Sequence, residues 1–306
     1  MGRKRNMHHH HHDHHDPHHH GFSPETGKRF LFAIALNLLF VIAEFALGFR
    51  YDSAGLLADA GHNLGDVGGL VISLAAFFML KKKADQTFTY GFKKATVLAA
   101  FINSLLLSAA VVLIVWECME KFRSGAAVNG LAVMGTAAAG IAVNGFTVLL
   151  LSKGQERDIN IKGAYLHMLA DTLVSIGVVV SGALILWTGA AWIDPVIGLV
   201  IAGIICWSGA GLFRESLHLI LDGVPESVDL NHLSTELNEI ENVAGIHHLH
   251  VWAISTTENA LTAHVKLKDL ARMEQTRSLL KDFLHHHGIS HATLEFESAS
   301  FPCTEA

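Results

Sequence analysis

Six long apolar segments constrain what this chain can fold into more than any other feature of its sequence. They span residues 30–49, 53–80, 95–116, 126–151, 160–188 and 192–213. Each has about 20 residues or more, enough for a helix to cross a hydrocarbon core of about 30 Å. Lipid offers no partners to backbone polar groups, so each segment is expected to be helical. The sequence therefore predicts an α-helical polytopic membrane protein with six transmembrane helices.

The charge content supports this fold class. Only 16% of the residues are charged, whereas an ordinary soluble domain carries about 25%. Basic residues gather on one side of the predicted helices, at Lys28, Arg29, Lys81–Lys83, Lys93 and Lys94. By the positive-inside rule, both termini are expected in the cytoplasm. We therefore predict a multi-pass protein of the inner (plasma) membrane.

The polar region before the first segment, residues 1–29, is rich in histidine and is expected to be disordered. The interruptions by Asp13, Asp16 and Pro17 favour a native segment that gathers metal ions over an expression tag. The histidines concerned are His8, His9, His10, His11, His12, His14, His15, His18, His19 and His20. The transmembrane domain is then expected at residues 30–214 and a cytoplasmic domain at 215–306.

The cytoplasmic domain is predicted to be a small α+β domain of order α-β-β-α-β, with two helices on one face of an open, metallochaperone-like sheet. The expected elements are helix Asp229–Glu241, strands Gly245–Ser255 and Ala260–Lys268, helix Met273–His287 and strand Ala292–Glu297. A unit of about 80 residues folds alone only marginally, which favours a homodimer. The net charge of −6, with its acidic excess in this region, excludes a generic nucleic-acid binder.

Ionisable side chains within the second and fifth segments are the main candidates for function, because such groups are costly in a membrane. His62 and Asp66 are four residues apart, and so are His167 and Asp171. Residues at this spacing share a helix face. In antiparallel helices His62 should lie level with Asp171, and Asp66 with His167. Two nitrogen and two oxygen ligands suit tetrahedral Zn²⁺.

The alternative for these four residues is a set of interhelical hydrogen bonds or salt bridges. One His–Asp pair would favour that interpretation, but two pairs at matching depth favour a metal site. Asp59 is either a partner of a ligand, a cation attractor or a cap near the helix start. Glu44, with Asn37 seven residues earlier, either lines a proton path or makes an interhelical hydrogen bond.

Several motifs together resemble the cation diffusion facilitator family, in particular its bacterial zinc exporters. The stretch from Ser53 to Asp66, SAGLLADAGHNLGD, is similar to the family's signature in the second helix, and Ala164–Asp171 is similar to its counterpart in the fifth. Thr89-Tyr-Gly-Phe, Asp194-Pro195 and His247–Trp252 are similar to further landmarks.

The resemblance implies a homodimeric antiporter that exports cytoplasmic Zn²⁺ in exchange for protons, with the four His and Asp residues as transport-site ligands. It also implies a cytoplasmic domain that binds zinc as a regulatory ligand. There His247 and His264 match ligand positions, and Glu295 and Glu297 fall where the family often has His and Asp. A further family site in the loop after the second helix is expected to be missing, since Asp85 stands alone there.

Zinc requires deprotonated ligands, so protons compete with the metal for the same side chains. This favours Zn²⁺/H⁺ antiport by alternating access, without an organic cofactor or an ATP-binding motif. The alternatives are an exporter of Co²⁺, Cd²⁺, Ni²⁺ or Fe²⁺, and a membrane metal sensor without flux. An intramembrane metalloprotease would need a motif such as H-E-x-x-H, which is absent, so the chain is not expected to be an enzyme.

Overall fold

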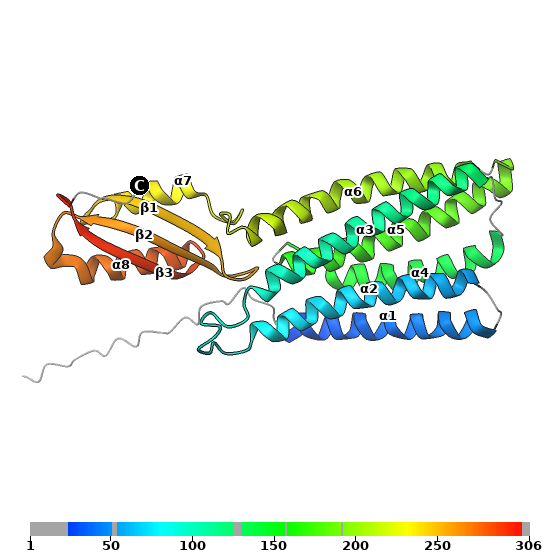
Figure 1. The fold of residues 1–306 in the computed structure, drawn as a ribbon, viewed down its shortest axis with the longest axis horizontal. Helices are drawn as coiled ribbons and strands as arrows, with labels where there is room; N and C mark the ends of the chain where they lie inside the picture. Colours follow the sequence, from blue (N-terminus) through cyan, green and yellow to red (C-terminus); the bar gives the residue numbers. More distant parts are fainter. Residues whose placement is uncertain (1–23, 51–53, 125–129, 157, 191, 302–306) are drawn as a thin grey trace, which may run out of the picture.

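The computed structural model describes residues 24–50, 54–124, 130–156, 158–190 and 192–301. An elongated bundle of helices forms one part of the molecule, and a smaller α+β domain lies at one end of the bundle (Figure 1). The histidines of the predicted His-rich tail precede the described residues.

Six helices form the bundle, and they correspond to the six predicted segments. They are α1 (Pro24–Arg50), α2 (Ala54–Leu80), α3 (Ala95–Ser124), α4 (Gly130–Leu151), α5 (Ile159–Thr188) and α6 (Ile193–Ile220). Among the described residues, five of these helices are long and apolar enough to cross a membrane, and α4 supplies the shorter apolar segment Ala137–Leu151. The prediction of a helical membrane domain is confirmed.

Helix α6 continues beyond the predicted segment, which ended at residue 213, and reaches Ile220. Its polar residues there find partners on other helices. Lys162 Nζ of α5 donates to Glu215 Oε2 at 2.6 Å, and Ser216 Oγ lies 3.4 Å from Ser104 Oγ of α3. These contacts satisfy polar groups that would be costly in lipid, so hydropathy alone underestimates the length of the helix.

Polar and small residues join the helices inside the bundle. Asn103 Nδ2 of α3 donates to Ser73 Oγ of α2 at 2.7 Å. At Gly177 of α5, a Cβ atom would lie 2.3 Å from Ile201 Cδ1 of α6, so only glycine fits without a shift. Close packing through small residues and interhelical hydrogen bonds is the usual way in which membrane helices associate.

The α+β domain follows the predicted order, with one additional short helix. Its elements are α7 (Leu230–Glu239), β1 (Val243–Ala253), β2 (Asn259–Leu267), the 3₁₀ helix η1 (Leu270–Arg272), α8 (Met273–His286) and β3 (Ile289–Ser298). The sheet order is β1-β2-β3, antiparallel between β1 and β2 and parallel between β2 and β3. The predicted α+β fold with three strands is confirmed.

Both helices of this domain pack against the same face of the sheet. Leu237 of α7, Leu280 of α8 and Leu261 of β2 are fully buried members of one apolar core. Successive side chains of a strand point to opposite faces. The alternation along β2 therefore directs His264 and Lys266 to the face that the helices leave open.

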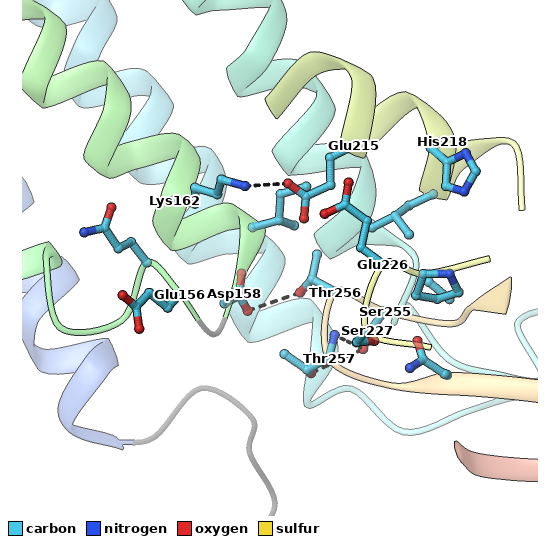
Figure 2. Close-up of a pocket in the computed structure, with 16 residues that line it drawn as sticks. Glu156, Asp158, Lys162, Glu215, His218, Glu226, Ser227, Ser255, Thr256 and Thr257 are labelled. Atoms are coloured by element: carbon cyan, nitrogen blue, oxygen red, sulfur yellow. Dashed lines mark hydrogen bonds and ion pairs between the residues drawn. The ribbon is translucent and has the colours of Figure 1, made fainter. Parts of the chain in front are cut away.

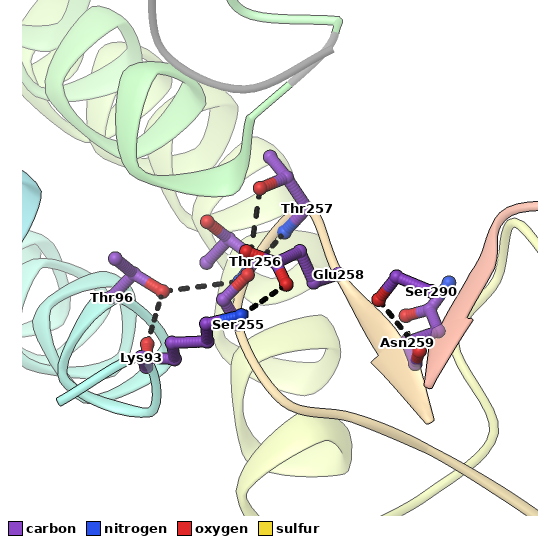
Figure 3. Close-up of polar contacts among 8 residues, drawn as sticks. All are labelled: Lys93, Thr96, Ser255, Thr256, Thr257, Glu258, Asn259 and Ser290. Carbon is purple, nitrogen blue, oxygen red and sulfur yellow. Dashed lines mark hydrogen bonds and ion pairs between the residues drawn. The ribbon is translucent and has the colours of Figure 1, made fainter. Parts of the chain in front are cut away.

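A tight turn between β1 and β2, the hairpin tip (residues 254–258), joins the two parts of the molecule. Figure 3 shows the backbone N–H of Thr256 donating to Thr96 Oγ1 of α3 at 3.1 Å. The hydroxyl of Thr256 donates to Asp158 Oδ2, at the start of α5, at 3.1 Å (Figure 2). Lys93 Nζ contacts Glu258 Oε2 at 2.5 Å.

The next lysine strengthens the same junction. Lys94 Nζ donates to the carbonyl oxygens of Leu219 and Ala253, at 3.1 and 3.0 Å, and pairs with Asp222 at 2.6 Å. One ammonium group therefore contacts the end of α6, the turn that follows this helix and the end of β1. The junction fixes the sheet against the ends of α3, α5 and α6.

Candidate metal centres

Helices α2 and α5 bring the four candidate transmembrane ligands together. Asp66 Oδ1 lies 2.7 Å from His167 Nε2, and Asp171 Oδ1 lies 3.7 Å from His62 Nε2. Within α2, His62 Nε2 is 3.9 Å from Asp66 Oδ2. We call these four residues the cage. The four residues therefore form two cross-helix pairs, Asp66 with His167 and His62 with Asp171, as the helical spacing in antiparallel helices requires. Each pair consists of one imidazole and one carboxylate.

The carboxylates form the buried side of the cage. Asp66 and Asp171 have side chains only 6% and 9% exposed, whereas His62 is 48% exposed. Asp66 Oδ2 and Asp171 Oδ2 are buried and accept no hydrogen bond from a described residue. Two buried carboxylates at close range need a compensating positive charge. The two carboxylates and two imidazoles have the ligand types and the excess of negative charge that suit a divalent cation.

Ligand atoms of His62, Asp66 and Asp171 all lie within 4.8 Å of one another. His167 joins this group through its contact with Asp66. Imidazole and carboxylate are both zinc ligands, and four of them satisfy the tetrahedral preference of that ion. The arrangement can also hold protons when no metal is bound, because each carboxylate faces an imidazole.

The accessory residues predicted near the cage have ordinary interhelical partners. Glu44 Oε2 of α1 accepts a hydrogen bond at 2.8 Å from Asn63 Nδ2, the residue after His62. Asn37 Nδ2 donates to Thr147 Oγ1 of α4 and to the Ala33 carbonyl, both at 2.9 Å. The side chain of Asp59 lies outside the described part of the chain. A direct hydrogen bond thus connects Glu44 to α2, one of the two helices that carry the cage.

A second cluster of metal-binding side chains lies on the open face of the sheet. Ligand atoms of His247, His264 and Glu297 lie within 4.8 Å of one another. Glu297 Oε1 is 2.8 Å from His264 Nδ1, and Glu297 Oε2 is 3.5 Å from His247 Nε2. The pairing of β1, β2 and β3 brings these residues together from three strands. We call them the sheet centre.

Like the cage, the sheet centre contains buried ligand atoms without a hydrogen-bond partner among the described residues. His247 Nε2 and Glu297 Oε2 are buried, and neither forms a hydrogen bond with a described residue. Glu297 is only 7% exposed, although it carries a carboxylate. Nitrogen and oxygen donors in this arrangement fit Zn²⁺.

Glu295 and His248 relate to the sheet centre differently from what the sequence suggests. Glu295 is 69% exposed, and its Oε2 lies 3.6 Å from His264 Nε2. His248, which sequence reasoning missed, lies with its ring centroid 5.3 Å from that of His247 and 5.1 Å from that of His264. The segment His247–His250 contains this residue, but regular strand alternation assigns it to the opposite face.

A cavity of about 750 Å³ lies at the junction, separate from both clusters (Figure 2). It is lined by the start of α5, the end of α6 and the hairpin tip. Asp158 borders it and caps α5 by accepting the Asn160 N–H at 2.7 Å. Burial raises the pKa of the Asp158 carboxyl, while the hydrogen bonds from Asn160 and Thr256 oppose this shift.

The loop between α2 and α3 contains Asp85, which forms a turn. Its Oδ1 accepts the backbone N–H groups of Thr87 and Phe88 at 2.8 and 2.7 Å. These hydrogen bonds, the one from Phe88 first, lower the pKa of the Asp85 carboxyl. The carboxylate therefore has a local structural role as an Asx turn.

Comparison with known protein families gives a match for each of the two parts of the molecule. A family model described as "Cation efflux transmembrane domain" matches residues 30–221. A second, described as "Cation efflux protein, cytoplasmic domain" and named for a dimer, matches residues 225–298.

Curated relatives of similar length also match. The chain is 37% identical over 273 residues to "Zinc transporter ZitB" of Yersinia pestis, covering 88% of this chain and 87% of the relative. It is 32% identical to the "Cadmium, cobalt and zinc/H(+)-K(+) antiporter" of Bacillus subtilis, covering 85% of each. It is 34% identical to the "Metal cation efflux system protein CzcD" of Cupriavidus metallidurans, covering 90% and 87%.

Proposed function

The chain belongs to the cation efflux family, and from that premise we propose that it exports Zn²⁺ from the cytoplasm in exchange for protons. Membership makes it a membrane transporter of divalent cations and not an enzyme. It also confirms the resemblance that the motifs of α2 and α5 indicate. The metal, the ligands and the counter-ion are the proposed part.

One observation carries the proposal. Two His-x-x-x-Asp pairs, one on α2 and one on α5, form a cluster within a bundle of apolar helices, with His167 Nε2 2.7 Å from Asp66 Oδ1. Two carboxylates and two neutral imidazoles around a divalent ion sum to zero charge, the state that a low-dielectric interior tolerates best. The zinc transporters among the relatives support this choice of cargo.

The mechanism follows from competition between metal and protons for the same atoms. A deprotonated cage binds Zn²⁺ on the cytoplasmic side, and a protonated cage releases it outside. The Asp66–His167 and Asp171–His62 pairs each offer a place for a proton. The protonated, empty cage then returns, so that proton entry drives metal exit. Glu44, hydrogen-bonded to Asn63, is the proposed accessory group beside this path.

The α+β domain is proposed to be cytoplasmic, with both chain termini on that side of the inner membrane. The dimer domain model that matches it supports a homodimer. We assign the sheet centre a regulatory role, with zinc bound by His247, His264 and Glu297. The His-rich tail is assigned the gathering of zinc near the entrance.

Other divalent cations are the second candidate for cargo. The antiporter of Bacillus subtilis is named for cadmium and cobalt as well as zinc. Ligand type alone does not separate Co²⁺ from Zn²⁺, because both accept imidazole and carboxylate. Selectivity must therefore be measured with several metals under the same proton gradient.

The decisive test is zinc-driven proton movement in proteoliposomes that contain the purified protein. Asp171→Ala should abolish both zinc flux and the coupled proton flux, since one carboxylate of the cage is lost. Thr172→Ala is the matched control, because its buried hydroxyl donates only to Met168 O of its own helix. Normal transport by Asp171→Ala would show that the cage is misassigned.

A further inference from the structure

His248 occupies an unusual backbone conformation beside the sheet centre. Its φ is 47°, in the left-handed region that non-glycine residues rarely adopt. The register of β1 against β2 shifts between His247 and His250, which marks a β-bulge. Adjacent strand residues normally face opposite ways, but here the His247 and His248 rings have centroids 5.3 Å apart.

We propose that His248 is the fourth ligand of the sheet centre, in place of Glu295. The centre then offers three imidazoles and the carboxylate of Glu297. This inference rests on the proposed function, in which the sheet centre holds zinc. It goes further by assigning a ligand that neither the sequence motif nor the matching of family positions provides.

Burial and ring packing favour His248 over Glu295. The ring centroid of His248 lies 5.3 Å from that of His247 and 5.1 Å from that of His264. Glu295 Oε2 lies 3.6 Å from His264 Nε2, and the Glu295 side chain is 69% exposed. A structural zinc site is closed by four ligands, and an exposed, flexible carboxylate is a poorer fourth member than a partly buried imidazole whose ring packs against two of the ligands.

The burial of Glu297 supports a metal ion at this centre. Its Oε2 is buried and accepts no hydrogen bond from a described residue, although it lies 3.5 Å from His247 Nε2. Buried carboxylates are normally paired with a charge or bound to a metal ion. A divalent cation held by the three imidazoles would compensate this carboxylate.

A role of His248 as a metal ligand explains why the bulge is present in β1. A non-glycine residue in the left-handed region costs free energy, and such residues persist where the surrounding structure or a function maintains them. The bulge turns the His248 ring toward His247 and His264, which regular pairing would prevent. Bulges often redirect a side chain at a functional site.

The test measures metal binding by the full-length protein in detergent, with Co²⁺ absorption as a probe of tetrahedral coordination and Zn²⁺ competition as a measure of affinity. The background carries His167→Ala/Asp171→Ala and alanine in place of the ten histidines of the His-rich tail, so that neither the cage nor the tail contributes. Asparagine tolerates positive φ, so His248→Asn removes the imidazole without opposing the bulge. We expect this variant to lose the tetrahedral Co²⁺ bands and to bind Zn²⁺ about 10–100-fold more weakly.

Two controls make the result specific. Glu295→Gln should leave the Co²⁺ spectrum and the zinc affinity unchanged. His250→Asn, which removes an exposed histidine from the same strand, should also have no effect. A third variant, His248→Gly, separates the backbone from the imidazole. Without metal it should melt no lower than the parent, because glycine adopts a positive φ without strain. On addition of zinc its melting temperature should rise less than that of the parent.

The outcomes separate this inference from the function on which it rests. Unchanged binding by His248→Asn would overturn it, whether or not Glu295→Gln is weakened. Loss in both variants would support His248 as a ligand and contradict its replacement of Glu295. His264→Ala tests the centre itself. If this variant and His248→Asn both bind zinc normally, the regulatory centre of the proposed function is wrong, while the transport cage is untouched.

Discussion

At the scale of single residues, the ligands of the cage differ in their exposure: the two carboxylates are buried, whereas the His62 imidazole is partly exposed. Asp66 and Asp171 lie inside the bundle, and His62 forms the accessible side. On the proposed function, a metal that enters past His62 would exchange its water for the carboxylates behind it. The identity of residue 62 should therefore influence which metals are accepted, whereas the carboxylates are needed for every metal.

The first residue-scale prediction concerns His62→Asp. Imidazole nitrogen favours zinc, while carboxylate oxygen is less selective and accepts cations such as Mn²⁺. The substitution also leaves the loaded cage with one negative charge. We expect the ratio of Cd²⁺ or Mn²⁺ flux to Zn²⁺ flux to rise by about tenfold, equivalent to about 1.4 kcal/mol. Competition assays in proteoliposomes measure the ratio.

His62→Asn provides the comparison for this change. Asparagine is similar in size to aspartate but adds no charge, and its amide is a weak metal ligand. It should lower the flux of all these metals together. A similar shift in selectivity in both variants would mean that the space at residue 62, and not the ligand type, determines the preference.

The spacing of residues was enough to predict that the four side chains of the cage lie together, since i and i+4 share a helix face in any α-helix. The pairing of His62 with Asp171 and of Asp66 with His167 required only that α2 and α5 are antiparallel neighbours. The ring of His248 could not be predicted, because the strand pattern assigns it to the other face. A one-residue bulge has no clear signature in a run of histidines.

At the scale of elements, the start of α5 shows how a capping residue can serve two neighbours. Asp158 accepts the Asn160 N–H within its own helix and the Thr256 hydroxyl from the hairpin tip. Its carboxylate is buried at this junction. The first turn of the helix that carries His167 and Asp171 is thus tied to the sheet of the α+β domain.

Asp158→Asn and Asp158→Ala should separate the cap from the charge. Asparagine caps a helix as well as aspartate does, while alanine loses about 0.5–2 kcal/mol. Because burial raises the pKa of Asp158, its protonated form is favoured in the folded state. That stabilisation is complete below the ordinary value of about 3.9 and is lost as pH rises through the higher folded pKa.

Melting temperatures of the purified protein at several pH values check this prediction. The parent should lose stability relative to Asp158→Asn as pH rises from about 4. Asp158→Ala should melt below both near neutral pH. A constant difference between parent and Asp158→Asn at all pH values would show that the carboxyl does not titrate at the junction.

The packing of α8 supports a second prediction at this scale. Leu280 is fully buried against the sheet, whereas the neighbouring Leu279 is 43% exposed. Leu280→Ala should destabilise the α+β domain by about 2–5 kcal/mol, through lost burial and the cavity that remains. Leu279→Ala, the control, should change the stability little. Urea denaturation followed by far-UV circular dichroism measures both, and equal effects would contradict the assigned core.

At the scale of the whole molecule, hydropathy predicted the six helices and alternation predicted the sheet, because both depend on local periodicity. The extension of α6 to Ile220 could not be predicted in this way. Glu215 and Ser216 are stabilised by contacts with Lys162 and Ser104, which are distant in sequence. The contact of the hairpin tip with α3 and α5 depends on the same kind of tertiary partner.

The last prediction tests whether the hairpin tip holds the α+β domain to the bundle. Thr256→Val preserves the shape of the side chain but removes the hydroxyl that donates to Asp158. A buried acceptor without its donor costs about 1–3 kcal/mol. Thr257→Val is the control, since its hydroxyl contacts only Ser255 within the tip, at 3.5 Å. Hydrogen exchange by mass spectrometry should show faster exchange at residues 254–258 and at the start of α5 in Thr256→Val alone. Because these two segments belong to different parts of the molecule, faster exchange in both would identify the Thr256–Asp158 contact as a link between the hairpin tip and α5. Faster exchange confined to the tip would leave α5 independent of it.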